Sequence, residues 1–93
     1  SQLVGFLVWQ ETDFEVEVLQ IAVLPSYQGR KIATALFDFL PANKEIFLEV
    51  RESNKPALLF YKKEKFEEIA RRKAYYHAPV EDAIVMKREI HER

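Results

Sequence analysis

The sequence contains no cysteine, a single methionine and only two glycines among its 93 residues. The lack of cysteine excludes disulfides, cysteine–zinc sites and a thiol nucleophile. The two histidines, His77 and His91, do not have the spacing of metal ligands, so we expect no metal site. Basic residues number 14 and acidic residues 15, and the net charge of −1 argues against a domain that binds nucleic acid through bulk positive charge.

Long hydrophobic runs are also missing. No apolar stretch approaches the roughly 20 residues that cross a bilayer, so we expect no membrane segment, and no signal peptide is visible. A hydrophobic content of 48% is nevertheless ordinary for a folded protein. We therefore expect a single domain, residues 1–93, that acts as a cytoplasmic enzyme or binding domain.

Residue patterns predict a mixed α/β fold, in the order strand, strand, helix, strand, helix, strand, strand. The expected strands are 3–10, 14–23, 45–51, 67–72 and 82–87, and the expected helices are 31–40 and from Ser53 or Asn54 to about Lys65. The first two strands should form an antiparallel hairpin, and the first helix should cross between parallel strands.

Three local expectations follow from this pattern. The nearly continuous apolar run from Leu19 to Leu24 suits a strand buried on both faces. The first helix should carry an apolar stripe of Ile32, Ala35, Leu36 and Phe39. Residues 74–81 should form a loop between the last two strands.

Two constellations could carry chemistry. The first is the loop Gln28-Gly29-Arg30-Lys31-Ile32-Ala33, between a strand and a helix. Backbone N–H groups at a helix start attract phosphate, and two cations add charge. An ordinary strand-to-helix turn with solvated cations is the alternative. The second constellation is a carboxylate, Glu49, at a strand end, followed by a phenol, Tyr61, on the next helix. This pair suits a general base and a general acid, although it could equally be a solvated glutamate and a core aromatic.

The segment from Ile21 to Leu36 resembles the acetyl-CoA motif of the GNAT acetyltransferases, with Gln28 and Ala33 at the ends of the motif. Lys31 stands where the family has its first glycine, so its side chain would either crowd the phosphates or contact them. The stretches around Glu49 and Tyr61, and later Arg71 to Tyr76 and Glu81 to Met86, are similar to the RimI-like branch, which acetylates the α-amino group of a ribosomal protein. The resemblance spans roughly residues 3 to 88.

This resemblance implies a GNAT-like fold, acetyl-CoA as co-substrate and a role for each matching residue. Glu49 would be the general base and Tyr61 the general acid, while Tyr75 and Tyr76 would border the peptide entrance. The implied cofactor-binding residues are Ile21, Ala22, Val23, Gln28, Gly29, Arg30, Lys31, Ile32, Ala33 and Asn54. Lys65 replaces a glycine that ends the second helix, where a left-handed cap would cost it roughly 1 kcal/mol.

Family members carry further elements before the segment that matches this chain, so the sequence is expected to be the C-terminal part of the family fold. A sheet without those strands exposes an edge that invites a homodimer. The sequence thus predicts an N-acetyltransferase acting on a protein N-terminus, with a ribosomal protein as the expected partner. A non-catalytic acyl-CoA-binding or assembly fragment, or an acetyltransferase for a small amine, are the alternatives.

Overall fold

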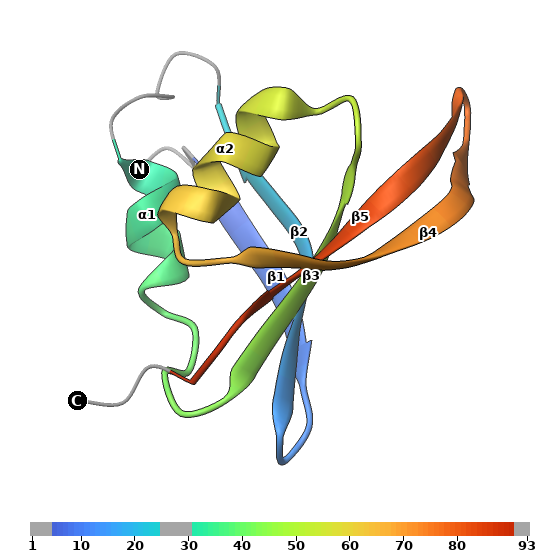
Figure 1. Ribbon diagram of the computed structural model, residues 1–93. Helices are drawn as coiled ribbons and strands as arrows, with labels where there is room; N and C mark the ends of the chain where they lie inside the picture. The colour runs from blue at the N-terminus through green and yellow to red at the C-terminus, as the bar shows by residue number, and fades with distance from the viewer. Residues whose placement is uncertain (1–4, 25–30, 91–93) are drawn as a thin grey trace.

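A computed structural model describes residues 5–24 and 31–90 (Figure 1). They form strands β1 (Gly5–Glu11), β2 (Glu15–Val23), β3 (Glu45–Arg51), β4 (Glu67–His77) and β5 (Val80–Arg88), with helices α1 (Ile32–Phe37) and α2 (Lys55–Lys63). The strands make one sheet in the order β1-β2-β3-β5-β4, in which only β2 and β3 run parallel. The predicted element order and mixed sheet are confirmed. Neither helix is long and apolar enough to cross a membrane.

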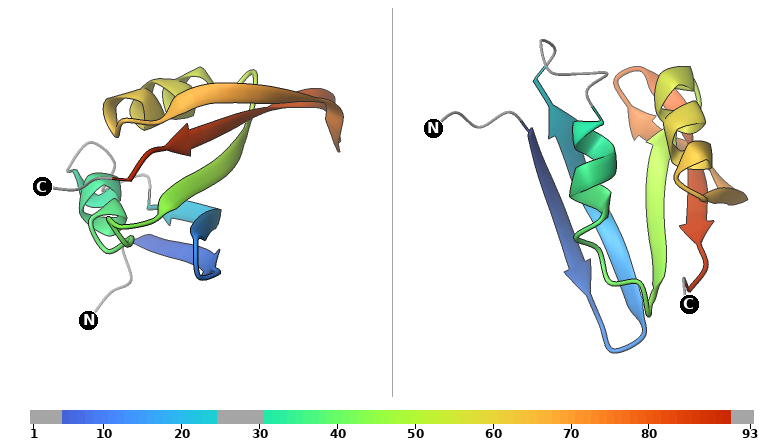
Figure 2. Two further views of the ribbon diagram at one scale, coloured as in Figure 1. Left: turned by 60° about the horizontal axis from the view of Figure 1, so that its bottom comes forward. Right: turned by 90° about the vertical axis from the view of Figure 1, so that its left-hand side faces the viewer.

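The parallel strands β2 and β3 pair with each other only at one end. Its register covers Glu15 to Glu17 of β2, beside Glu45 to Phe47 of β3. Beyond that point the two strands diverge, as the right-hand view of Figure 2 shows. The prediction that the run from Leu19 is buried on both faces is therefore wrong: the Leu19 side chain is 53% exposed, at the register shift between β1 and β2 and where β3 no longer pairs with β2.

Both helices pack on one face of the sheet. Strand β3 turns Ile46, Leu48 and Val50 into the core, whereas Glu49, which alternates with them, belongs to the opposite face. The core also holds an aromatic cluster that joins the two helices and the residue before β4, consisting of Phe37, Phe60, Tyr61 and Phe66. The ring contacts of this cluster hold α2 against α1.

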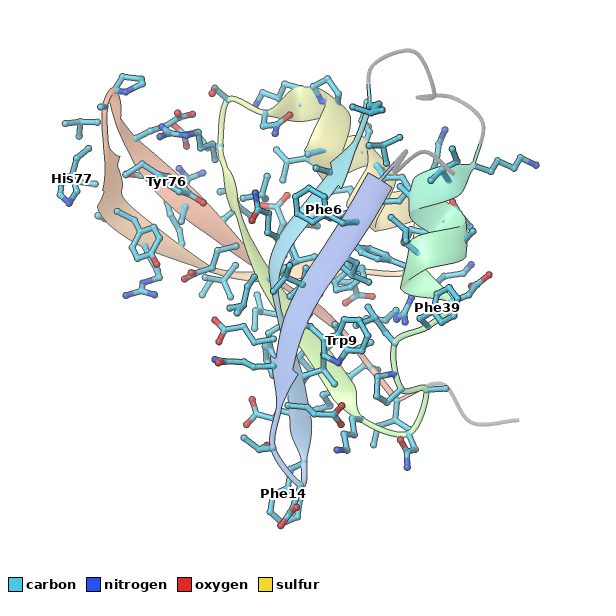
Figure 3. All side chains as sticks on the ribbon, turned by 180° about the vertical axis from the view of Figure 1, so that it is seen from behind. Phe6, Trp9, Phe14, Phe39, Tyr76 and His77 are labelled. Carbon is cyan, nitrogen blue, oxygen red and sulfur yellow. The ribbon has the colours of Figure 1, made fainter. Side chains whose placement is uncertain are left out.

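Helix α1 is shorter than predicted, and it buries a different set of side chains. It ends at Phe37, and a turn follows in which the Leu40 N–H donates to the carbonyl of Phe37 (3.1 Å). Phe37 and Leu40 are buried, whereas Phe39 is 75% exposed at the end of the helix (Figure 3) and Ala35 is exposed as well. The predicted stripe is wrong for Ala35 and Phe39. The buried side chains are instead Phe37, the last residue of the helix, and Leu40, which lies in the following turn, where the helical spacing no longer applies.

Strand β4 is longer than predicted, and the expected loop over residues 74–81 is wrong. The strand continues to His77, and the connecting turn is confined to residues 78–79. A bulge interrupts the pairing of β4 with β5 between Arg72 and Tyr76, and Ala74 within it has a φ of 49°. Such a bulge breaks the alternation of side chains on which strand prediction depends.

The C-terminus of α2 is a Schellman motif built around a lysine. The Phe66 N–H donates to the Tyr61 carbonyl (2.9 Å), and the Lys65 N–H to the Lys62 carbonyl (3.1 Å). Lys65 has a φ of 76°, so the expected left-handed cap on a non-glycine residue is present. The rings of Tyr61 and Phe66 meet edge-on with their centroids 5.9 Å apart, which supplies the apolar contact typical of this motif.

Candidate functional site

A hollow of about 240 Å³ lies where β2 and β3 diverge. Four of the residues predicted for the site line it together: Ile21 from β2, Glu49 from β3, Asn54 before α2, and Tyr61 from α2. The sequence separates these residues by up to 40 positions, and the divergence of the two strands brings them to one place. The other lining residues are Val18, Leu19, Gln20, Leu48, Val50, Arg51 and Tyr76.

Glu49 and Tyr61 reach the hollow from opposite faces of the sheet. Glu49 lies on the face away from the helices, whereas Tyr61 belongs to the helix that covers the other face. They can line one hollow because the strands that would separate them are splayed apart. A reacting group in the gap would therefore have a carboxylate on one side and a phenol on the other.

Tyr61 is both a core aromatic and a lining residue. Its ring stacks on Phe37 with centroids 6.0 Å apart, and the residue is only 9% exposed. Burial raises the pKa of the Tyr61 hydroxyl above its ordinary value of 10.0, with a smaller contribution from the neighbouring Tyr76. The phenol is therefore protonated at neutral pH and can donate a hydrogen bond or a proton into the hollow.

Glu49 is held at the hollow by strand pairing and by a cation. It pairs with Val85 of the neighbouring strand β5, which fixes the backbone. Its carboxylate Oε2 accepts a hydrogen bond from Nη1 of Arg72 at 2.7 Å. Tyr76 lies on the same side of the site, and burial followed by the charge of Glu49 raises the pKa of its hydroxyl. In Figure 3 Tyr76 points toward the body of the protein, and its neighbour His77 points away.

The corner between β3 and α2 is anchored by Glu81. Its Oε1 accepts from the Ser53 N–H (2.6 Å), and its Oε2 accepts from Arg51 (3.0 Å), whose guanidinium carbon lies 4.3 Å from the centre of the Tyr76 ring. These contacts, the Ser53 hydrogen bond first, lower the pKa of the Glu81 carboxyl. Asn54 then caps α2, with Oδ1 accepting from the Ala57 N–H (3.3 Å). Among the described residues no hydrogen bond from the Asn54 NH₂ group is found, so this group can donate to a ligand.

The predicted cofactor residues fall into three groups. Ile21, Ala22 and Val23 lie on the diverging half of β2, where no pairing with β3 is found within the described residues. Beside Ile21 and Ala22, a linear ligand that carries amide groups can supply the hydrogen bonds that a neighbouring strand would otherwise make.

The second group, Lys31 to Ala33, lies at the start of α1. Lys31 has a φ of 61°, the left-handed region in which the motif glycine of the family would be unstrained. Ile32 and Ala33 form the first turn of α1 and do not line the hollow. Gln28, Gly29 and Arg30 lie outside the described residues.

Several lining residues were not singled out from the sequence. Leu19 and Gln20 read as ordinary positions of a buried strand, and Arg51 as a charged strand end. Their position in the sequence could have indicated them, because each lies within two residues of Ile21 or Glu49, which were predicted for the site. Tyr75 and Tyr76, expected at the peptide entrance, meet edge-on with centroids 5.1 Å apart, and Tyr76 lines the hollow.

Comparison with known proteins defines the class. The model of the acetyltransferase (GNAT) domain family matches residues 1–68, so the chain belongs to the GNAT acetyltransferases. It is 38% identical over 80 residues to the N-alpha-acetyltransferase RimI of Mycobacterium tuberculosis, covering 82% of this chain and 50% of that protein. It is 37% identical over 95 residues to the ribosomal protein bS18-alanine N-acetyltransferase of Haemophilus influenzae, covering 92% and 64%.

Solved structures agree with this assignment. The ribosomal-protein-S18-alanine N-acetyltransferase of Escherichia coli superposes with a TM-score of 0.84 at 31% identity, over 97% of this chain and 63% of that chain. Ard1 from Thermoplasma volcanium gives a TM-score of 0.86 at 31% identity, over 96% and 64%. The chain thus spans about half to two thirds of the length of these relatives, and the expected GNAT fold is confirmed.

Proposed function

We propose that this protein is an N-acetyltransferase that moves an acetyl group from acetyl-CoA to the N-terminal α-amino group of a protein. The observation that carries the proposal is the hollow between the diverging strands, which has Glu49 on one side and Tyr61 on the other. The relatives named as acting on a ribosomal protein make such a protein the proposed target. We propose the cytoplasm as its location, where that target is made.

Glu49 would act as the general base. An α-amine has a pKa near 8, so about a tenth of it is uncharged at neutral pH and a carboxylate base is sufficient. The uncharged nitrogen attacks the thioester carbonyl, a carbon–nitrogen bond forms, and Glu49 takes the proton that the nitrogen loses. Because the amine attacks directly, the chain needs no nucleophile of its own, which fits the lack of cysteine.

Tyr61 would act as the general acid. Its raised pKa keeps the hydroxyl protonated, so it can donate to the sulfur as the carbon–sulfur bond breaks. The backbone N–H groups of the diverging half of β2 would bind the carbonyl oxygen as it gains negative charge. Both groups are fixed before a substrate enters, Tyr61 by the aromatic cluster and β2 by its pairing with β1.

Acetyl-CoA would supply the activated acetyl group. We propose that Ile21, Ala22 and Val23 hold its extended arm by strand-like hydrogen bonds and that Asn54 contacts it from the start of α2. The loop Gln28–Ala33 would hold the phosphates through backbone amides, as in the family motif. Position 31 has the left-handed backbone that suits a glycine, although a lysine stands there, which is consistent with a loop of this kind.

The substrate class is tested with three acceptors and [¹⁴C]acetyl-CoA. The first is a short peptide with a free N-terminus. The second is the same peptide with a blocked N-terminus and an internal lysine, and the third is a small polyamine. We expect label only in the first. Transfer to the polyamine alone would support a small-amine acetyltransferase, and calorimetry that detects no binding at millimolar acetyl-CoA would refute the cofactor assignment.

A homodimer through a sheet edge remains a proposal as well. In the described sheet β1 and β4 are the outer strands, and an outer strand offers unpaired backbone groups to a second copy. Light scattering at micromolar concentration distinguishes a mass of 11.0 kDa from twice that value.

A further inference from the structure

The ion pair between Glu49 and Arg72 spans an intervening strand. Glu49 is on β3 and pairs with Val85, whereas Arg72 is on β4 and pairs with Ala83, so Arg72 reaches diagonally across β5. The two side chains are 21% and 54% exposed, and Nη1 lies 2.7 Å from Oε2. The hydrogen bond that Arg72 donates to Glu49 is the main cause that raises the pKa of the Arg72 guanidinium above its ordinary value.

A backbone bulge holds Arg72 in this place. The pairing of β4 with β5 breaks between Arg72 and Tyr76, and the Ala74 N–H within the bulge donates to Asp82 Oδ1 at 2.8 Å. As a result the Arg72 guanidinium carbon lies 4.2 Å from the centre of the Tyr75 ring. A guanidinium over an aromatic face is attracted to it, which limits the conformations that the arginine can adopt. Bulges are a common device for aiming a side chain near a functional site.

We propose that Arg72 is a positioning residue for the carboxylate of Glu49, an inference that rests on the proposed role of Glu49 as the base. Arg72 takes one carboxylate oxygen, Oε2. Within the described part of the chain no hydrogen bond to the other oxygen, Oε1, is found, so this atom is left to accept the proton of the amine. Tyr75 in turn restrains Arg72. The result is a chain of contacts from the bulge in β4 to the reacting nitrogen.

The neighbouring arginine provides a matched control. Arg71 has the same charge and is also exposed, but it pairs with Glu52 and with Asp82 (3.0 Å) and not with Glu49. It does not line the hollow. Replacing Arg71 therefore removes one cation and two ion pairs from the same strand and leaves the Glu49 carboxylate held by Arg72.

The test is a double-mutant cycle on acetyl transfer to the free-amine peptide. Arg72→Ala is measured alone and together with Glu49→Gln, beside Arg72→Lys and Arg71→Ala, each checked for a cooperative thermal melt. We expect Arg72→Ala to lower kcat about fivefold, the upper end for an exposed ion pair, with an unchanged KM for acetyl-CoA. Arg72→Lys should recover part of the loss, and Arg71→Ala should keep the wild-type kcat.

The cycle separates positioning from general structural support. If Arg72 acts through Glu49, Arg72→Ala causes no further loss in the Glu49→Gln background. An equal loss in both backgrounds, or a kcat at or above the wild-type value for Arg72→Ala, overturns the inference while the proposed function stands. If the wild-type protein itself acetylates no α-amine, the proposed function fails and this inference fails with it.

Discussion

Replacing Lys65 with glycine should stabilise the protein. The residue follows α2 with a φ of 76°, a conformation that costs a non-glycine residue about 1–2 kcal/mol. Glycine removes that cost but gives the unfolded chain more freedom, which offsets about 0.5–1 kcal/mol. We therefore expect Lys65→Gly to raise the free energy of unfolding by about 0.5–1 kcal/mol, or the melting temperature by about 2–8 °C for a domain of this size.

A matched control lies two residues earlier. Lys63 is the last residue of α2 and is also exposed, but it has helical backbone, so Lys63→Gly should lower the free energy of unfolding by about 1 kcal/mol. Urea denaturation followed by circular dichroism measures both variants against the wild type. If Lys65→Gly destabilises the protein as much as Lys63→Gly does, the left-handed cap at position 65 is refuted.

Three further predictions concern the rest of the fold. Lys31→Gly should stabilise by about 0.5–1 kcal/mol for the same reason, and a calorimetric loss of acetyl-CoA affinity would show that the ammonium contacts phosphate. Gly5→Ala should lower the melting temperature, because an added Cβ would lie 2.9 Å from the Ala22 carbonyl oxygen. The pKa of Glu81 is lowered because its contacts favour the charged carboxylate, so these contacts stabilise the fold at a pH above 4.5, the ordinary pKa, and less as the pH falls below it. Glu81→Gln should therefore flatten the acid side of a plot of stability against pH.

Local signals in the sequence were sufficient for most of the fold. β3 has the predicted bounds, because its apolar residues are bounded by the charged residues Glu45 and Arg51. Of the two residues expected to cap α2, Ser53 and Asn54, the cap is Asn54. Lys65 could be expected to cap α2 in the left-handed conformation from its place in the family pattern alone, and it does.

What the sequence could not predict depends on contacts between distant segments. Leu19 was expected to be buried because an apolar run looks the same in the sequence whether or not β3 stays paired with it. The second half of β4 was not predicted because the bulge at Ala74 breaks the alternation of its side chains. The ion pair of Glu49 with Arg72 depends on that bulge and on the strand order β3-β5-β4. The convergence of Glu49 and Tyr61 needed the divergence of two strands, a property that neither strand carries alone.

The central claim is that Glu49 takes the proton of an amine bound in the hollow. The most direct measurement is the rate at which Glu49→Gln acetylates a free-amine peptide, with Glu52→Gln as a control that changes a nearby carboxylate outside the lining. Removing a general base should lower kcat by about a hundredfold or more, with unchanged affinity for acetyl-CoA by calorimetry. A Glu49→Gln variant that keeps the wild-type rate would contradict the account.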